Sequence, residues 1–153
     1  MKTLSVLLIA LLAAASAQPS GFGLGIIAGE PTGLSAKAWL GGTVAVDAAA
    51  AWSVYHYEAL HVHADLLHHN FDLIRVESGD LPVYYGIGGR LKLANAGRGE
   101  ADLRLGVRVP VGLSYIFEAA PVDVFLEVAP LLDLIPKTEF GVNAAVGARY
   151  YFR

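Results

Sequence analysis

The C-terminal stretch from Phe140 to Arg153 constrains the fold most, because its side chains alternate in character. Its even positions are all apolar or aromatic, namely Phe140, Val142, Ala144, Val146, Ala148, Tyr150 and Phe152. Successive side chains of a β-strand point to opposite faces, so the stretch predicts a long strand with one uncharged face. A strand that crosses a membrane obliquely needs about 9 to 11 residues. The stretch therefore predicts the closing strand of a membrane β-barrel.

Composition narrows the class of protein. The chain has 153 residues, of which 55% are hydrophobic and 16% charged, with a net charge of -3. So little charge is unusual for a water-soluble surface, and the scattered Lys and Arg do not form the basic patch of a nucleic-acid-binding protein. The sequence has no cysteine, which excludes disulfides and thiol chemistry.

The N-terminus has the pattern of a secretory signal peptide. Lys2 provides a positive charge, Leu4 to Ala14 form an apolar run, and Ala15 to Ala17 form a small-residue cleavage site. The run is too short to cross a bilayer as a helix. We therefore predict a cleaved signal peptide over residues 1–17 and one exported domain over residues 18–153.

Seven further segments alternate in the same way, over residues 23–29, 34–40, 43–54, 60–67, 81–93, 101–117 and 122–129. The alanine run at 48–51 has helical propensity, but the alternation around it is the stronger signal. Most of the connections are short and several carry Gly or Pro, as hairpins require. With the C-terminal strand, the pattern predicts an all-β, eight-stranded, antiparallel up-and-down barrel.

Two features indicate that the apolar face is the outer one. The polar face is rich in glycine, which suits the cramped interior of an eight-stranded barrel. The apolar face carries no charge and ends in aromatic residues, as interfacial girdles require. We therefore predict a transmembrane β-barrel in the cell outer membrane. The alternative is a soluble, lipocalin-like periplasmic barrel that binds an apolar ligand inside an inward apolar face.

With the apolar face outward, charged residues of both signs point into the lumen: Lys37, Asp47, Asp65, Arg90, Lys92, Asp102, Arg104, Arg108, Asp123, Glu127 and Arg149. Unpaired buried charges are costly, so we expect an ion-pair network, with Arg108 and Glu127 as one structural pair. An eight-stranded barrel has room for side chains but not for a channel. We expect a porin-like architecture with a plugged lumen.

Several segments of the chain resemble a known family: residues 29–35 (GEPTGLS), 84–91 (YYGIGGRL), 106–115 (GVRVPVGLSY), 124–130 (VFLEVAP) and 149–152 (RYYF). They are similar to the small outer-membrane β-barrels first grouped from spirochaetes and related to the OmpA transmembrane domain. The resemblance covers most of the mature chain. It implies an eight-stranded outer-membrane protein that shows its loops to a host or environment, with no shared enzymatic activity.

The sequence departs from this family pattern in two places. Outer-membrane chains usually end on an aromatic residue, whereas Arg153 follows Phe152 here. With the N-terminus in the periplasm, the outward connections are short, at 29–33, 55–59, 95–100 and 130–138. The longest connection, 68–80, then faces the periplasm, which reverses the usual asymmetry of length.

Two constellations suggest other chemistry. His61, His63 and Asp65 share one face of a strand and form a candidate metal-ligand set, although such groups more often hydrogen-bond within a lumen. His68 and His69 are interpreted as a solvated strand end. A lipid-modifying hydrolase or acyltransferase would pair one serine with His61 or His63, the candidates being Ser35, Ser53 and Ser114, but the sequence has no nucleophile elbow.

The prediction is therefore a structural or surface-interaction role without catalysis, cofactor or nucleic acid. The expected partners are outer-membrane lipid, the assembly machinery through the C-terminal strand, and a surface ligand of unknown identity.

Overall fold

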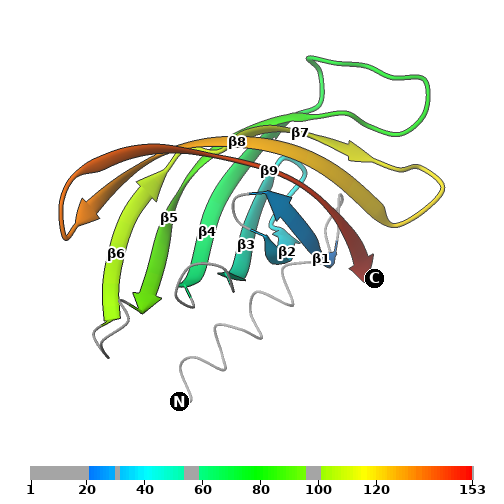
Figure 1. Ribbon diagram of the computed structural model, residues 1–153. Helices are drawn as coiled ribbons and strands as arrows, with labels where there is room; N and C mark the ends of the chain where they lie inside the picture. Colours follow the sequence, from blue (N-terminus) through cyan, green and yellow to red (C-terminus); the bar gives the residue numbers. More distant parts are fainter. Residues whose placement is uncertain (1–20, 30–31, 54–58, 96–100, 153) are drawn as a thin grey trace, which may run out of the picture.

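The computed structural model describes residues 21–29, 32–53, 59–95 and 101–152. Over this part of the chain every regular element is a strand (Figure 1): β1 Phe22–Gly29, β2 Gly33–Trp39, β3 Val44–Ser53, β4 Ala59–Asn70, β5 Val83–Asn95, β6 Ala101–Arg108, β7 Val111–Ile116, β8 Val122–Ile135 and β9 Glu139–Phe152. Among the described residues, no helix has the length and apolar character to cross a membrane. The predicted signal peptide and Arg153 lie outside the described residues, as do the connections at 30–31, 54–58 and 96–100.

All nine strands belong to one antiparallel sheet that closes into a barrel-like ring. Each strand from β1 to β4 pairs with the next, β4 pairs with β5, and β8 and β9 complete the ring by returning to β1. Between β5 and β8 lie both β6 and β7, which share one position in the ring. The predicted all-β class is confirmed. The predicted single strand 101–117 is wrong, since it is divided into β6 and β7.

The division between β6 and β7 falls at Val109 and Pro110. Proline has no backbone N–H, so it cannot donate to a neighbouring strand. The remaining groups keep the ring hydrogen-bonded, because Gly86 N donates to Pro110 O at 3.0 Å and Val109 N donates to Pro130 O at 2.9 Å. The alternation also continues across the division, with Val109 exposed and Pro110 buried.

Two predicted strand ends are wrong, because both strands continue further. β4 does not end at Leu67, since residues up to Asn70 pair with β5. β8 does not end before Pro130, since it continues to Ile135 against β6 and β9. The connections are therefore 71–82 in place of 68–80, and 136–138 in place of 130–138. The longer connection leaves the ring as the green loop in Figure 1.

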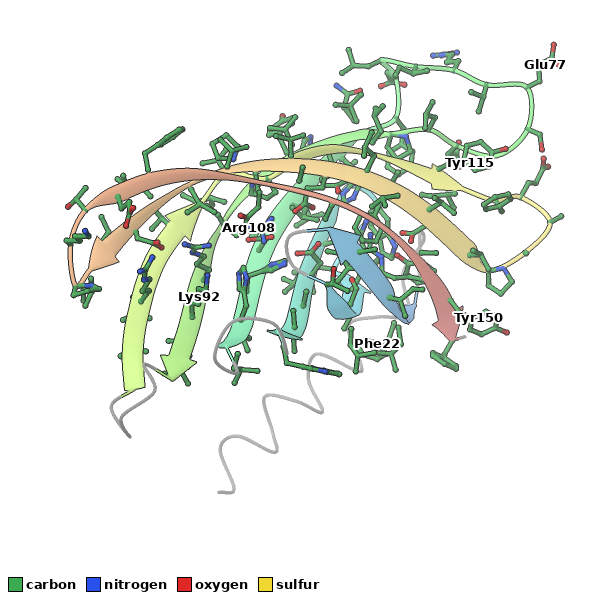
Figure 2. The ribbon with its side chains drawn as sticks, in the orientation of Figure 1. Phe22, Glu77, Lys92, Arg108, Tyr115 and Tyr150 are labelled. Atoms are coloured by element: carbon green, nitrogen blue, oxygen red, sulfur yellow. The ribbon has the colours of Figure 1, made fainter. Side chains whose placement is uncertain are left out.

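The two faces of the sheet differ completely. Every strand exposes large apolar side chains on the outside, including Ile26, Leu34, Trp52, Leu66, Ile87, Val107, Leu113, Leu126 and Val146. Charged side chains point inward, and Figure 2 shows Arg108 inside the ring and Tyr150 outside it. Relative exposure makes the contrast plain: Ile26 is 65% exposed, whereas Arg108 is 1% exposed.

Inward glycines make room for large inward side chains on the neighbouring strand. The register places Tyr84 opposite Gly112, Phe125 opposite Gly147 and Tyr151 opposite Gly23. A Cβ atom on any of these glycines would come within 3.0 Å of the facing ring. The three rings therefore fit inside the sheet only because the residues that face them are glycines, which have no side chain.

Candidate functional site

A group of buried charged and imidazole side chains fills the middle of the ring, and we call it the interior cluster. Each member is at most 4% exposed, and together they come from six strands: Lys37, Asp47, His63, Asp65, His69, Arg108, Asp123, Glu127 and Arg149. All occupy inward positions of the strand alternation. The cluster is thus the direct product of the sequence pattern on a closed ring.

One branch of the interior cluster is built on Glu127. Arg108 Nη2 donates a short hydrogen bond to Glu127 Oε1, and Tyr84 OH donates to Glu127 Oε2 at 2.8 Å. Arg108 Nε also lies 3.5 Å from Asp65 Oδ1. One carboxylate on β8 therefore fixes groups from β5 and β6, and the Arg108 charge is compensated within the interior.

A second branch is built on Asp123. Arg149 Nε donates to Asp123 Oδ1 at 3.1 Å, and Tyr151 OH donates to Asp123 Oδ2 at 2.6 Å. Ser114 Oγ makes a longer contact of 3.4 Å with the same Oδ2. The Arg149 guanidinium also stacks over the ring of Phe125, 4.0 Å from its centroid. Asp123 therefore joins three strands, and its neighbours compensate its charge.

A third branch holds Lys37 against aromatic rings. Lys37 Nζ lies 2.8 Å from His69 Nε2 and 4.0 Å from Asp123 Oδ2. An ammonium has only hydrogens to offer, so His69 Nε2 accepts, which leaves Nδ1 to donate to Thr43 O at 3.2 Å. The ammonium also lies 4.5 Å from the Trp39 ring centroid. The prediction that His69 belongs to a solvated strand end is wrong, because it is 0% exposed.

The remaining members, Asp47, His63 and Asp65, converge, and most of their polar atoms have no hydrogen-bond partner among the described residues. Each offers one potential ligand atom, and these three atoms lie within 4.8 Å of one another. His63 Nδ1 is 3.3 Å from Asp65 Oδ2, yet both His63 nitrogens and both Asp65 oxygens have no hydrogen-bond partner among the described residues. Oδ1 of Asp47 is also unpartnered. We call these three residues the Asp–His–Asp centre.

The Asp–His–Asp centre differs from the set that the sequence suggested. His63 and Asp65 are brought together as expected from their spacing, but the third residue is Asp47 on β3 and not His61. The strand register explains this, because Asp47 stands opposite Asp65 across the β3–β4 pairing. His61 lies two residues before His63 on the same face of β4, and its ring centroid is 5.9 Å from that of His63.

Other predicted lumen charges lie outside the interior cluster. Arg90 pairs with Asp133 through Nε to Oδ1 at 2.9 Å and Nη2 to Oδ2 at 2.5 Å. Arg104 lies 3.8 Å from Glu139 at the partly exposed end of the ring. Lys92 is only half-buried, and Figure 2 shows it below Arg108. The side chain of Asp102 lies outside the part that the structure describes.

Sequence reasoning missed four residues that complete these contacts, namely His69, Tyr84, Asp133 and Tyr151. Asp133 would have been found by continuing the alternation of β8 past Pro130, since it has the same parity as Asp123 and Glu127. Tyr84 and Tyr151 were inward by parity as well. The alternation of side chains therefore places these residues inside the ring, but it does not predict which tyrosine hydroxyl bonds to which carboxylate.

The serines considered for catalysis have other surroundings. Ser114 is buried and its hydroxyl contacts Asp123, not a histidine. Ser35 is 3% exposed on the inner face of β2. The side chain of Ser53 lies outside the described residues. Among the described residues, neither Ser35 nor Ser114 makes the serine–histidine hydrogen bond that nucleophilic catalysis requires.

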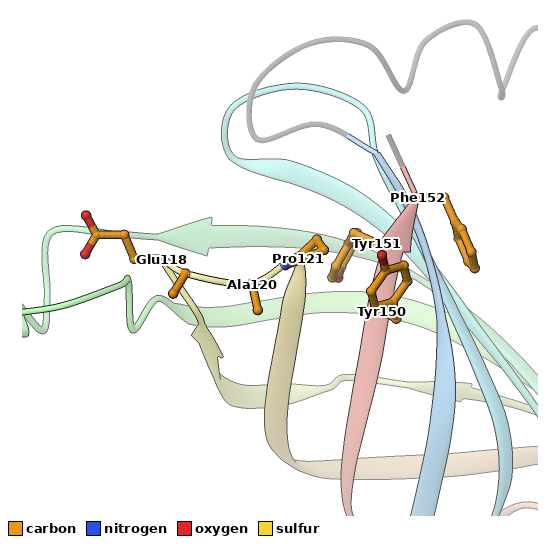
Figure 3. Close-up of a pocket in the computed structure, with 7 residues that line it drawn as sticks. Glu118, Ala120, Pro121, Tyr150, Tyr151 and Phe152 are labelled. Carbon is orange, nitrogen blue, oxygen red and sulfur yellow. The ribbon is translucent and has the colours of Figure 1, made fainter.

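An open hollow of about 420 Å³ lies at the end of the ring where β1 begins and β9 ends (Figure 3). It is lined by the turn Glu118 to Pro121 and by Tyr150, Tyr151 and Phe152. Among the described residues of its lining, Glu118 is the one with a charge, and its carboxylate points away from the aromatic rings in Figure 3. The described lining therefore does not bring polar groups together as a ligand site does.

Comparison with known proteins gives no relative: family models, curated proteins and solved structures all return no match.

Proposed function

We propose that the chain is an outer-membrane β-barrel with a structural or surface-interaction role, a lumen plugged by charged side chains, and no catalytic activity. The observation that carries this proposal is the inverted distribution of polarity. Large apolar side chains are exposed on the outside of all nine strands, while the charges of the interior cluster are buried.

Exposed apolar area on this scale favours lipid over water. The largest apolar patch on an ordinary soluble monomer is about 300–600 Å². Here the apolar surface surrounds the ring, and single residues such as Ile26, Ile87 and Phe140 are each more than 60% exposed. Removing apolar surface from water is worth roughly 25 cal/mol per Å². A lipid bilayer removes this surface from water, and so provides this free energy, without a partner protein.

Aromatic residues lie near both ends of the outer face. Toward the end of the ring where β9 ends, Tyr150 and Phe152 pack edge to face at 5.2 Å between ring centroids. Tyr115 and Phe117 do the same at 4.7 Å. Trp52 lies near the far end of β3. Aromatic girdles at two interfaces are typical of outer-membrane barrels, so this arrangement supports the proposal.

The alternative, a soluble lipocalin-like barrel, needs an apolar face directed inward around its ligand. The described interior instead holds carboxylates, guanidinium groups and imidazoles packed against aromatic rings. An apolar ligand would have to displace ion pairs such as Arg149–Asp123. This distribution favours the membrane barrel over the soluble one.

The proposal includes export through a signal peptide over residues 1–17 and recognition of β9 by the outer-membrane assembly machinery. With the start of β1 and the end of β9 on the periplasmic side, the opposite end of the ring, which carries the connection at 136–138, faces outward. A surface ligand would bind at that end.

The two tryptophans of the chain test the proposal directly, because Trp39 is 2% exposed inside the ring and Trp52 is 60% exposed outside it. The variant Trp39→Phe leaves Trp52 as the only fluorophore, and Trp52→Phe leaves Trp39. In vesicles of brominated lipid, Trp52 fluorescence should be quenched several-fold more than that of Trp39. Equal quenching, or none at Trp52, would contradict a lipid-facing outer surface.

A further inference from the structure

Most polar atoms of the Asp–His–Asp centre have no hydrogen-bond partner among the described residues, and the other unpartnered buried atoms include Arg108 Nε and Arg149 Nη1 beside it. Asp47, His63 and Asp65 are at most 4% exposed, so water cannot freely replace the missing partners. Buried polar groups are normally hydrogen-bonded, and each exception needs an explanation. Three residues with unpartnered acceptor atoms directed at one point are the arrangement that a cation fills.

The charge of the interior cluster gives an independent reason to expect a cation. Its four carboxylates face one lysine and two arginines, while the nearby Arg90–Asp133 pair is balanced in itself. With neutral imidazoles and all four carboxylates ionised, the cluster has one negative charge in excess. An uncompensated buried charge is costly, so the site favours an added positive charge.

The neighbouring arginines do not satisfy the centre. Arg108 Nε lies 3.5 Å from Asp65 Oδ1, and Arg149 Nη1 lies 3.7 Å from Asp47 Oδ2. Neither contact is a hydrogen bond, although Arg108 Nε and Arg149 Nη1 have no other hydrogen-bond partner among the described residues. A bound cation would share the two carboxylates of the centre with these guanidinium groups.

We propose that Asp47, His63 and Asp65 bind one divalent transition-metal cation of the zinc type. Imidazole with carboxylates is a ligand set for Zn²⁺ and its neighbours and not for Mg²⁺ or Ca²⁺, which prefer oxygen alone. Zinc lies about 2.0–2.2 Å from such ligands. The three ligand atoms already lie within 4.8 Å of one another. Side-chain rotations would therefore be enough to place all three at bonding distance from one zinc ion.

The site is structural in character. It joins β3 to β4 in the interior, and its ligands are shielded from solvent on all sides by the ring. His61 is not a ligand but flanks the His63 ring. The cation enters during folding and neutralises the excess charge, so it should also raise the stability of the folded chain.

The test measures bound metal in the full chain folded in detergent, after removal of metal with a chelator and addition of Zn²⁺. We expect one Zn²⁺ per folded chain after desalting. Replacing the bound ion with Co²⁺ should give the visible absorption bands of a low-coordinate site with a nitrogen ligand. A folded wild-type chain that retains no metal above the buffer blank overturns the proposal.

Matched variants locate the ligands. Asp47→Asn and His63→Ala should reduce retained Zn²⁺ at least tenfold, whereas His61→Ala and the outward-facing His68→Ala should retain one ion. Loss of metal in His61→Ala with retention in Asp47→Asn contradicts the geometry. Equal loss in His68→Ala shows adventitious binding and also overturns the proposal. Each variant is first checked for folding by its gel mobility, so failure of the metal site is distinguishable from failure of the barrel.

Discussion

Gly88 and Gly106 stand directly opposite Asp65 and Asp133 in the register of the sheet. A Cβ atom at Gly88 would collide with the Asp65 carboxylate, and one at Gly106 would lie 2.5 Å from Asp133 Oδ1. The glycines therefore admit carboxylates to the interior just as Gly112 admits Tyr84. At the scale of single residues, the absence of a Cβ atom at these glycines makes room for the inward side chains that face them.

Gly112→Ala tests this role. The new methyl group would lie 2.5 Å from the Tyr84 ring, and it would also meet the backbone of β8. Overpacking a filled interior typically costs about 1–3 kcal/mol. We expect the free energy of unfolding in urea to fall by that amount for the chain folded in detergent.

The matched control for this substitution is Gly41→Ala, where a Cβ atom would have nothing within 4 Å. Its unfolding free energy should stay within about 0.5 kcal/mol of wild type. Equal effects of the two substitutions would show that the facing ring does not determine the need for glycine.

Glu127→Gln tests the hydrogen bonding of the interior. The substitution keeps the shape of the side chain, but its single acceptor oxygen can serve only one of the two donors, Arg108 and Tyr84, that bind Glu127. A buried donor left without an acceptor costs about 1–3 kcal/mol, and more where the donor is charged. We expect a large drop in the urea midpoint, while Glu77→Gln on the exposed connection should leave it unchanged.

An unaltered midpoint in Glu127→Gln would mean that the Arg108 charge is solvated, which contradicts a filled interior.

The alternation of the sequence predicted which residues point inward, because parity along a strand is a local property. Lys37, Arg108 and Arg149 were placed inside on that basis. Their partners could not be predicted in the same way. Lys37 on β2 approaches Asp123 on β8, and such contacts across the ring depend on the relative stagger of strands that are not neighbours.

At the scale of elements, β8 shows how proline misleads a reading of strand ends. Pro130 was expected to begin a connection, because proline interrupts most central strands. In the structure β8 continues, and the carbonyl of Pro130 accepts a hydrogen bond from Val109 N at 2.9 Å. The loss of one donor is tolerated because the strands on both sides still pair with residues beyond it.

Leu126→Arg tests whether the outer face of β8 meets lipid. Leu126 is 57% exposed near the middle of the strand. An arginine near the bilayer midplane costs about 2–4 kcal/mol, so the variant should insert poorly into vesicles and unfold at lower urea. The matched variant Ile74→Arg, on the exposed 71–82 connection, should behave as wild type. If Leu126→Arg is as stable as Ile74→Arg, the face is not buried in lipid.

At the scale of the whole molecule, the two ends of the ring are unlike. The end where β1 begins and β9 ends carries the connections 40–43, 71–82 and 117–121, of which 71–82 is the longest. Ser78 and Glu118 join two of these connections by a hydrogen bond of 3.2 Å, and Tyr115 OH donates to Ser78 O at 2.7 Å. The more elaborate end would therefore face the periplasm under the proposed orientation.

The central claim is that an apolar exterior and a charged interior make this chain a membrane-embedded closed barrel. The most direct test folds the chain into detergent or lipid and compares its gel mobility with and without boiling, with far-ultraviolet circular dichroism as the control for strand content. We predict a boiling-dependent shift together with a strand-type spectrum, and loss of solubility without detergent. A chain that stays folded and soluble without detergent, and shows no shift, would contradict the account.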